Sequence, residues 1–121
     1  MNMLIHRPDP AAEVQTEERC FILEVWGDES DSAVSIARAR VVPGVTTQLH
    51  RLRGVDERYH IVEGKGSVKV GGLAPHDVLP GDVVAIPAGT AQQIANSGKT
   101  DLVFYCICSP RFTPDCYESM E

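Results

Sequence analysis

Three polar side chains, His50, Glu57 and Gln92, are spaced so that they can face one cavity. His50 and Leu52 lie two residues apart in an extended segment, so their side chains point to the same face. Glu57 follows a short turn and opens the next segment, and the turn at residues 87–89 delivers Gln92 on a later one. Such a group offers either proton transfer to a bound molecule, by Glu57, or a hydrogen-bonded polar cluster.

Three neighbouring residues, Gln48, Leu52 and Tyr59, are expected to line the same cavity. Tyr59 has the strand parity of Glu57, so it is either a pocket residue that donates a hydrogen bond or an ordinary core aromatic. His60 has the opposite parity, and we expect it to face away from the cavity. The sequence alone assigns no catalytic residue.

The chain around these residues consists of short apolar segments separated by turn-forming residues. None of the segments is long enough for an ordinary helix, and glycine and proline clusters lie between them. Extended segments are predicted at residues 21–26, 34–42, 46–52, 59–63, 67–70, 83–86, 92–95 and 102–108. This pattern predicts an all-β domain, either a sandwich or a barrel.

Composition and charge restrict the classes of function. With 121 residues, of which 43% are hydrophobic and 23% charged, the chain is expected to fold as one domain. A formal net charge of -6 repels phosphate backbones and anionic lipids, so neither nucleic acid nor a membrane is expected as a partner. The sequence has neither a long apolar run nor the layout of a signal peptide, which predicts a cytoplasmic protein.

The outer faces of two predicted strands are expected to contact another part of the protein, another subunit or solvent. The strand predicted at residues 102–108 is apolar on both faces, so its outer face needs a cover. The N-terminal stretch, the C-terminal tail and a second copy of the chain are the candidates, and we favour a homodimer. In an earlier strand, Arg38 and Arg40 are expected to face solvent or another subunit.

The four cysteines are expected to be free thiols. Their spacing is not that of a zinc knuckle, and a cytosolic chain keeps its thiols reduced. Cys106 and Cys108 share strand parity, so they are expected on one face. They form either a paired site for a soft metal or, as we favour, two small buried apolar side chains.

Two stretches of the chain resemble the two sequence motifs of the cupin superfamily. The glycine, first histidine, glutamate and last glycine of the first motif are matched by Gly44, His50, Glu57 and Gly64. Leu52 occupies the position of the second histidine. The glycine, Pro-x-Gly and asparagine of the second motif are matched by Gly81, Pro87, Gly89 and Asn96. Gln92 stands where the histidine of that motif would be. The resemblance covers residues 34–108 and implies a double-stranded β-helix, which is a jelly-roll barrel.

The resemblance also implies a divalent metal ion held by three histidines and a glutamate. His50 and Glu57 are kept, Gln92 offers a weaker amide oxygen, and Leu52 offers no ligand. A metal site would therefore consist of His50, Glu57 and Gln92 with reduced affinity. Zinc, nickel, manganese and iron are the expected ions, with open positions for a small organic ligand.

These inferences leave three functions open. The first is a metal-binding cupin with a pocket for a small organic ligand, which as an enzyme would be an oxygenase, isomerase or lyase. The alternative is a non-catalytic cupin that binds a small molecule or a sugar without metal, and the third is a dimeric scaffold. Residues 1–18 are expected to form an N-terminal arm, 19–109 the barrel, and 110–121 a tail packed on the barrel or on a dimer partner.

Overall fold

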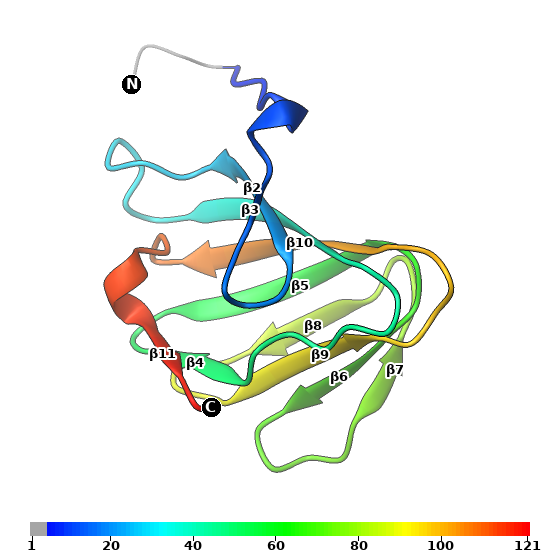
Figure 1. The fold of residues 1–121 in the computed structure, drawn as a ribbon. Helices are drawn as coiled ribbons and strands as arrows, with labels where there is room; N and C mark the ends of the chain where they lie inside the picture. The colour runs from blue at the N-terminus through cyan, green and yellow to red at the C-terminus, as the bar shows by residue number, and fades with distance from the viewer. Residues whose placement is uncertain (1–4) are drawn as a thin grey trace.

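The computed structural model describes residues 5–121, which form two antiparallel sheets that pack face to face (Figure 1). The larger sheet contains, in spatial order, β1 (Val14–Gln15), β2 (Phe21–Trp26), β3 (Ser35–Val41), β10 (Leu102–Ser109), β5 (Asp56–Glu63) and β8 (Val83–Ile86). The smaller sheet contains β11 (Tyr117–Ser119), β4 (His50–Leu52), β9 (Gln92–Asn96), β6 (Gly66–Val70) and β7 (His76–Val78). Two 3-10 helices, η1 (Pro10–Ala12) and η2 (Pro114–Cys116), precede β1 and β11. No helix within residues 5–121 is long and apolar enough to cross a membrane. The predicted all-β class is confirmed.

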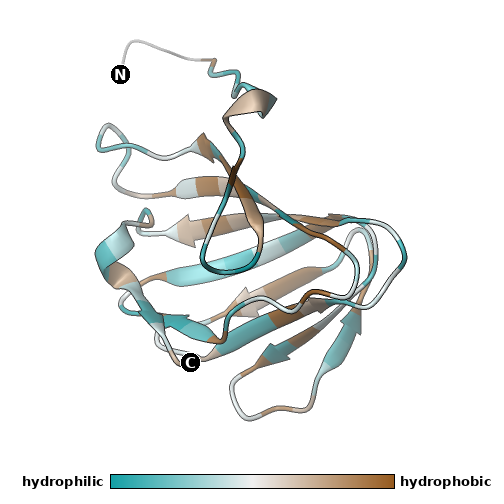
Figure 2. Cartoon of the chain, in the orientation of Figure 1, coloured by the Kyte–Doolittle hydropathy of each residue, from teal (hydrophilic) through white to brown (hydrophobic). Residues whose placement is uncertain are grey.

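The core lies between the two sheets because successive strand residues point to opposite faces. On β5, Glu57, Tyr59 and Ile61 are buried, whereas His60 is exposed. Apolar and polar residues alternate along several strands of the larger sheet (Figure 2). Most buried apolar residues of both sheets meet in one cluster, whose least exposed members are Val41, Ile61, Ile94 and Leu102. A second, smaller cluster contains Leu52, Val55, Cys108 and Cys116.

β4 is shorter than the strand expected at residues 46–52. The backbone N–H of Gln48 donates to the carbonyl oxygen of Glu18, and that of Leu49 donates to the carboxylate of Glu121. These donors therefore bond to the two flanking segments of the chain and not to the neighbouring strand. The expected strand was too long because its pairing is interrupted by partners that are remote in sequence.

Both flanking segments pack on the barrel (Figure 1). β1 pairs with β2, and β11 pairs with β4. On β3, Arg40 donates to Glu13 with an Nη2–Oε1 distance of 2.7 Å and to Asp101 at 3.1 Å, and Arg38 reaches Glu13 at 3.4 Å. This arginine face was expected to meet solvent or another subunit. Both arginine side chains are partly exposed, at 28% and 29%, and are otherwise covered by the N-terminal segment of the same chain.

The outer face of β10 carries Val103, Tyr105 and Ile107. Val103 is buried, whereas Tyr105 and Ile107 are only partly buried within one chain. The homodimer expected on this face stays a prediction.

Gly64 is required by a close approach between two parts of the chain. Its φ is +82°, and a Cβ atom there would lie 2.5 Å from the carbonyl oxygen of Asp101 and 2.9 Å from Cα of Leu102. Gly44 has a similar φ of +81°, but a Cβ atom there would meet nothing within 4 Å. Gly44 is thus explained by backbone conformation alone, whereas Gly64 also allows the β5–β6 turn to contact the start of β10.

Candidate functional site

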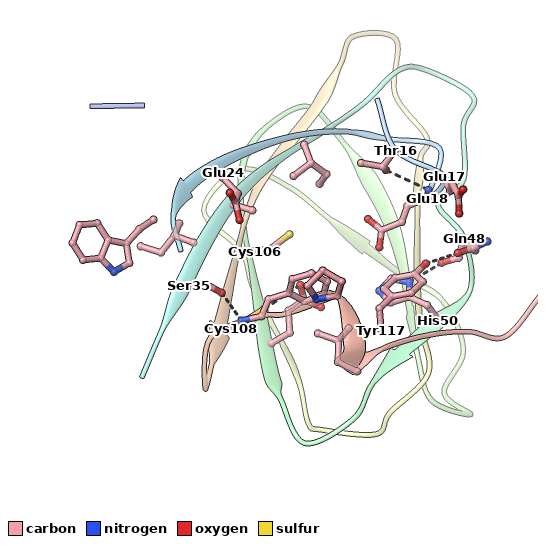
Figure 3. A pocket seen from close by; sticks show the side chains of 18 residues that line it. Thr16, Glu17, Glu18, Glu24, Ser35, Gln48, His50, Cys106, Cys108 and Tyr117 are labelled. Carbon is pink, nitrogen blue, oxygen red and sulfur yellow. Dashed lines mark hydrogen bonds between the residues drawn. The ribbon is translucent and has the colours of Figure 1, made fainter. Parts of the chain in front are cut away.

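A cavity of about 380 Å³ lies between the strands of the barrel and the two flanking segments (Figure 3). Its wall comes from the β1–β2 turn, from β2, β3, β4, β5 and β10, and from residues 112–117. The lining is mostly apolar, and the volume is that of an ordinary small-molecule site. Arg19 and Glu121, joined by hydrogen bonds of 3.0 and 2.8 Å, tie the β1–β2 turn to the segment that follows β11.

His50 is held in one orientation in the wall of the cavity. Its Nδ1 atom lies 2.8 Å from the carbonyl oxygen of Gln48, and its ring stacks on Tyr117 with a centroid distance of 4.7 Å. A carbonyl oxygen can only accept, so Nδ1 carries the proton. In the neutral ring, Nε2 therefore keeps an available lone pair.

Glu57 presents a buried carboxyl group at the same cavity, with 7% of its surface exposed. The thiol of Cys108 donates to Oε2 with an Sγ–Oε2 distance of 3.6 Å. Oε1 has no hydrogen-bond partner among the described residues. Burial raises the pKa of Glu57 to about 7. The Gln92 side chain, by hydrogen bonding, acts to lower this pKa, and the nearby Glu18 carboxylate acts to raise it further. The carboxyl group is thus half ionised near neutral pH.

Gln92 lies opposite His50 in the β4–β9 pair but does not line the cavity. Its amide oxygen, which was expected to be a weak metal ligand, accepts a hydrogen bond from the hydroxyl of Tyr59. Both side chains are almost fully buried, and the Tyr59 ring packs on Phe104 with a centroid distance of 4.6 Å. Tyr59 borders a small adjoining hollow and belongs to the hydrophobic core. Gln92 therefore supports the core, and its side chain also lies close enough to Glu57 to lower the pKa of that carboxyl group.

The remaining expected pocket residues, Gln48 and Leu52, lie in the wall of the cavity. Leu52 is 2% exposed and adds an apolar surface where the family motif has a histidine. The amide oxygen of Gln48 accepts a hydrogen bond from the hydroxyl of Tyr117. His60 is exposed on the outer face of β5, away from the cavity.

The cysteines are free, as predicted. Cys106 and Cys108 both line the cavity from β10, so they share one face. Burial raises the pKa of both thiols, and the nearby Glu57 carboxylate adds to each shift. The two thiols are therefore protonated at neutral pH, and a protonated thiol is a poor ligand for a metal ion.

The cupin-domain family model matches residues 37–108, which is more than half of the chain. This chain belongs to the cupin family. The match includes β3 to β10 and both motifs that carry His50, Glu57 and Gln92. The jelly-roll barrel implied by the motifs is confirmed.

Similar proteins come from Methanocaldococcus jannaschii and Thermotoga maritima. An uncharacterized protein of Methanocaldococcus jannaschii is 32% identical over 87 residues, which span 72% of this chain and 69% of that protein. An oxalate-binding protein of Thermotoga maritima is 34% identical over 71 residues, which span 59% of this chain and 58% of that protein. A solved structure described as a predicted oxalate decarboxylase of Thermotoga maritima aligns with a TM-score of 0.78 and 23% identity, covering 88% of this chain and 99% of that one.

The residues of this cupin fit the metal ion of the family poorly. Within residues 5–121, no group of three or more His, Cys, Asp or Glu side chains is arranged to hold a metal ion. His50 and Glu57 are two possible donors, but the amide oxygen of Gln92 is engaged by Tyr59 and Leu52 has no donor. A structural or catalytic zinc site uses at least three protein ligands.

Several wall residues of this cupin were missed by sequence reasoning. Glu17, Glu18, Trp26 and Tyr117 lie outside the two motifs, in segments interpreted as arms or packing. Glu24 lies on β2 and also lines the cavity. The available signal was weak, because alternation within β2 is broken by an irregularity in its pairing with β3.

Proposed function

We propose that this cupin binds a small organic molecule in the cavity without the help of a metal ion. The observation that carries the proposal is the unpartnered, buried Oε1 atom of Glu57 beside the oriented ring of His50 in a mostly apolar cavity. A buried polar atom without a partner costs about 1–3 kcal/mol, which a ligand that donates a hydrogen bond would recover. The apolar wall would take up the rest of the ligand.

Oxalate, which the Thermotoga maritima relative binds according to its name, is a poor fit to this cavity. Oxalate is a dianion that requires a metal ion or basic side chains. No lysine or arginine among residues 5–121 lines this cavity, and four glutamates do. The proposal therefore differs from the activity of that relative.

Trp26 supplies a direct test, since it is the single tryptophan of the chain and lines the cavity. Titration of its intrinsic fluorescence with a neutral compound of suitable size, cyclohexylmethanol, is expected to be saturable. The Ala37→Leu variant replaces a methyl side chain in the cavity wall by an isobutyl group and should weaken binding by about tenfold or more. Ala85→Leu makes the same change on an exposed residue of β8 and should bind like the wild type.

The proposal fails if no saturable signal is obtained with neutral, anionic or cationic cyclohexyl compounds. It also fails if Ala37→Leu and Ala85→Leu weaken binding equally. Stoichiometric metal in the protein purified without a histidine tag would contradict its metal-free part.

A further inference from the structure

The cavity wall is strongly biased in charge. Four carboxyl side chains line it, those of Glu17, Glu18, Glu24 and Glu57, and it has no lysine or arginine within the described part of the chain. None of the four glutamates forms an ion pair with any of residues 5–121. Figure 3 shows Glu17 and Glu18 near His50 and Tyr117, with Glu24 toward the opposite side near Cys106. Because low-dielectric walls concentrate the field of such charges, a cation is favoured in the cavity and an anion is repelled.

Among the hydrogen-bonding groups of the wall, free acceptors outnumber free donors, which also favours a cation that can donate. Four donors are already used within the protein: the hydroxyls of Thr16 and Tyr117, the thiol of Cys108 and the Nδ1–H of His50. The indole N–H of Trp26 likewise donates to Asp31 at 2.9 Å. The Gln48 amide and the Ser35 hydroxyl keep hydrogens to donate, whereas the glutamate oxygens are mostly open acceptors. The cavity therefore calls for a ligand rich in donors.

Glu57 gives an independent indication of where such a donor would bind. Its side chain is more than nine-tenths buried, it lines the cavity, and its Oε1 atom has no partner in the described chain. Buried carboxylate oxygens in folded proteins are almost always paired. Oε1 itself has almost no accessible surface, so a donor in the cavity would reach it after a small shift of the Glu57 side chain and would then complete its set of partners.

Aromatic side chains provide a surface for the organic part of the ligand. Trp26, Phe112 and Tyr117 all line the cavity, and Phe112 is an exposed apolar residue with 37% of its surface accessible. Aromatic faces attract cations as well as apolar groups. The rings thus favour an apolar body that carries a positive charge.

We infer that the ligand of this cupin is an organic amine, bound as its ammonium ion with an N–H group donated to Glu57 and its apolar body against the aromatic wall. The inference rests on the proposed function, because it names the chemical class of the molecule in the same cavity. The ligand is inferred to be an ammonium ion with an N–H group and not a quaternary ammonium ion, which has no hydrogen to donate to Glu57.

The test compares three compounds of one shape: cyclohexylmethylamine, cyclohexylmethanol and cyclohexanecarboxylate. Each is titrated at pH 8 while the fluorescence of Trp26 is followed, since a primary aliphatic amine has a pKa of about 10.4 and is cationic there. The amine is expected to bind about tenfold or more tightly than the alcohol, because a hydrogen bond to a charged group is stronger than a neutral one. The carboxylate is expected to bind more weakly than the alcohol.

Two variants locate the effect at Glu57. Glu57→Gln removes the carboxylate and should reduce the preference for the amine to about twofold, while alcohol binding reports that the cavity is intact. Glu63→Gln makes the same change at an exposed position of the same strand, outside the cavity, and should keep the preference of the wild type. Ala37→Leu should weaken all three compounds, which separates the cavity from general attraction to an acidic surface.

The possible results separate this inference from the proposed function. Saturable alcohol binding without a preference for the amine would overturn the amine inference and leave the proposed function standing. An amine preference that persists in Glu57→Gln, or that is lost equally in Glu63→Gln, would also overturn it. Absence of binding by all three compounds would overturn the proposed function and the inference together.

Discussion

The hydroxyl of Tyr59 on β5 donates a hydrogen bond to the amide oxygen of Gln92 on β9, and both side chains are buried between the sheets. This bond joins the larger sheet to the smaller one. It also occupies the oxygen atom that would otherwise be the third donor beside His50 and Glu57. The same contact therefore supports the core and directs the amide oxygen, which keeps a second lone pair, toward Tyr59.

Removal of the Tyr59 hydroxyl should destabilise the protein. In Tyr59→Phe the amide oxygen of Gln92 is left buried without its donor, so the free energy of unfolding should fall by about 1–3 kcal/mol. Urea unfolding followed by circular dichroism measures the change. Tyr105→Phe, at a partly buried position of β10, should change the value by less than about 0.5 kcal/mol. Equal effects of the two variants would contradict the assigned role.

The wild-type protein, purified without a histidine tag, should contain less than one metal ion per chain. A chelator should leave its melting temperature unchanged, because two donors do not form a tight site. Elemental analysis and thermal unfolding with and without chelator check both statements.

A designed variant with two additional histidines should bind a metal ion. Leu52→His and Gln92→His restore the two missing imidazoles, and Tyr59→Phe in the same chain removes the hydroxyl that would compete for the second one. We expect zinc affinity to rise by about 100-fold or more, as measured by competition with a chromogenic chelator. Glu57→Gln in the same background is the control and should lose most of the gain.

Glu57 should make the stability of the protein fall as the pH rises from about 4.5 to about 7. An unfolded chain releases this proton near pH 4.5, whereas the folded protein holds it until about pH 7, because burial disfavours the charge. Across this window the folded state binds more protons, so the free energy of unfolding decreases by about 3 kcal/mol and then levels off.

The Glu57→Gln variant isolates this contribution, since all other groups titrate alike in both proteins. It should be more stable than the wild type at pH 8 and lose that advantage near pH 4.5, as measured by urea unfolding at each pH. Glu63→Gln should show no such crossover. A constant difference between Glu57→Gln and the wild type at both pH values would refute the raised pKa.

Gly64→Ala should destabilise the protein far more than Gly44→Ala. Both glycines have positive φ, which costs an alanine about 1–2 kcal/mol. At Gly64 the new Cβ atom would also clash with the backbone of Asp101, which adds about 1–3 kcal/mol. Thermal unfolding of the two variants measures the difference, and similar melting temperatures would argue against the close contact at Gly64.

The strands and the orientation of His50 and Glu57 could be predicted because strand side chains alternate with a period of two. The hydrogen bond between Tyr59 and Gln92 could not be predicted. It depends on the spacing between the two sheets, and the two residues lie on strands that are distant in the sequence. Residues 48 and 49 likewise could not be predicted to lie outside β4. Their N–H groups donate to Glu18 and Glu121, and no local sequence pattern connects these residues.

The acidic character of the cavity was hidden for the same reason. Glu17 and Glu18 belong to a turn whose position over the barrel is set by the pairing of β1 with β2 and by the link between Arg19 and Glu121. A strand-by-strand interpretation treats such residues as solvated surface. Their role becomes visible only when the flanking segments are seen as part of the wall.

Most of the cavity wall comes from residues before 37 and after 108, outside the stretch that matches the cupin domain. The barrel fold and most of the cavity lining are therefore encoded in different parts of the chain, although His50 and Glu57 belong to the matched stretch. Substitutions in the flanking segments can change the lining of the cavity while the motif glycines and the buried strands stay intact. Two proteins that share this barrel closely can thus differ in most of the lining of this cavity.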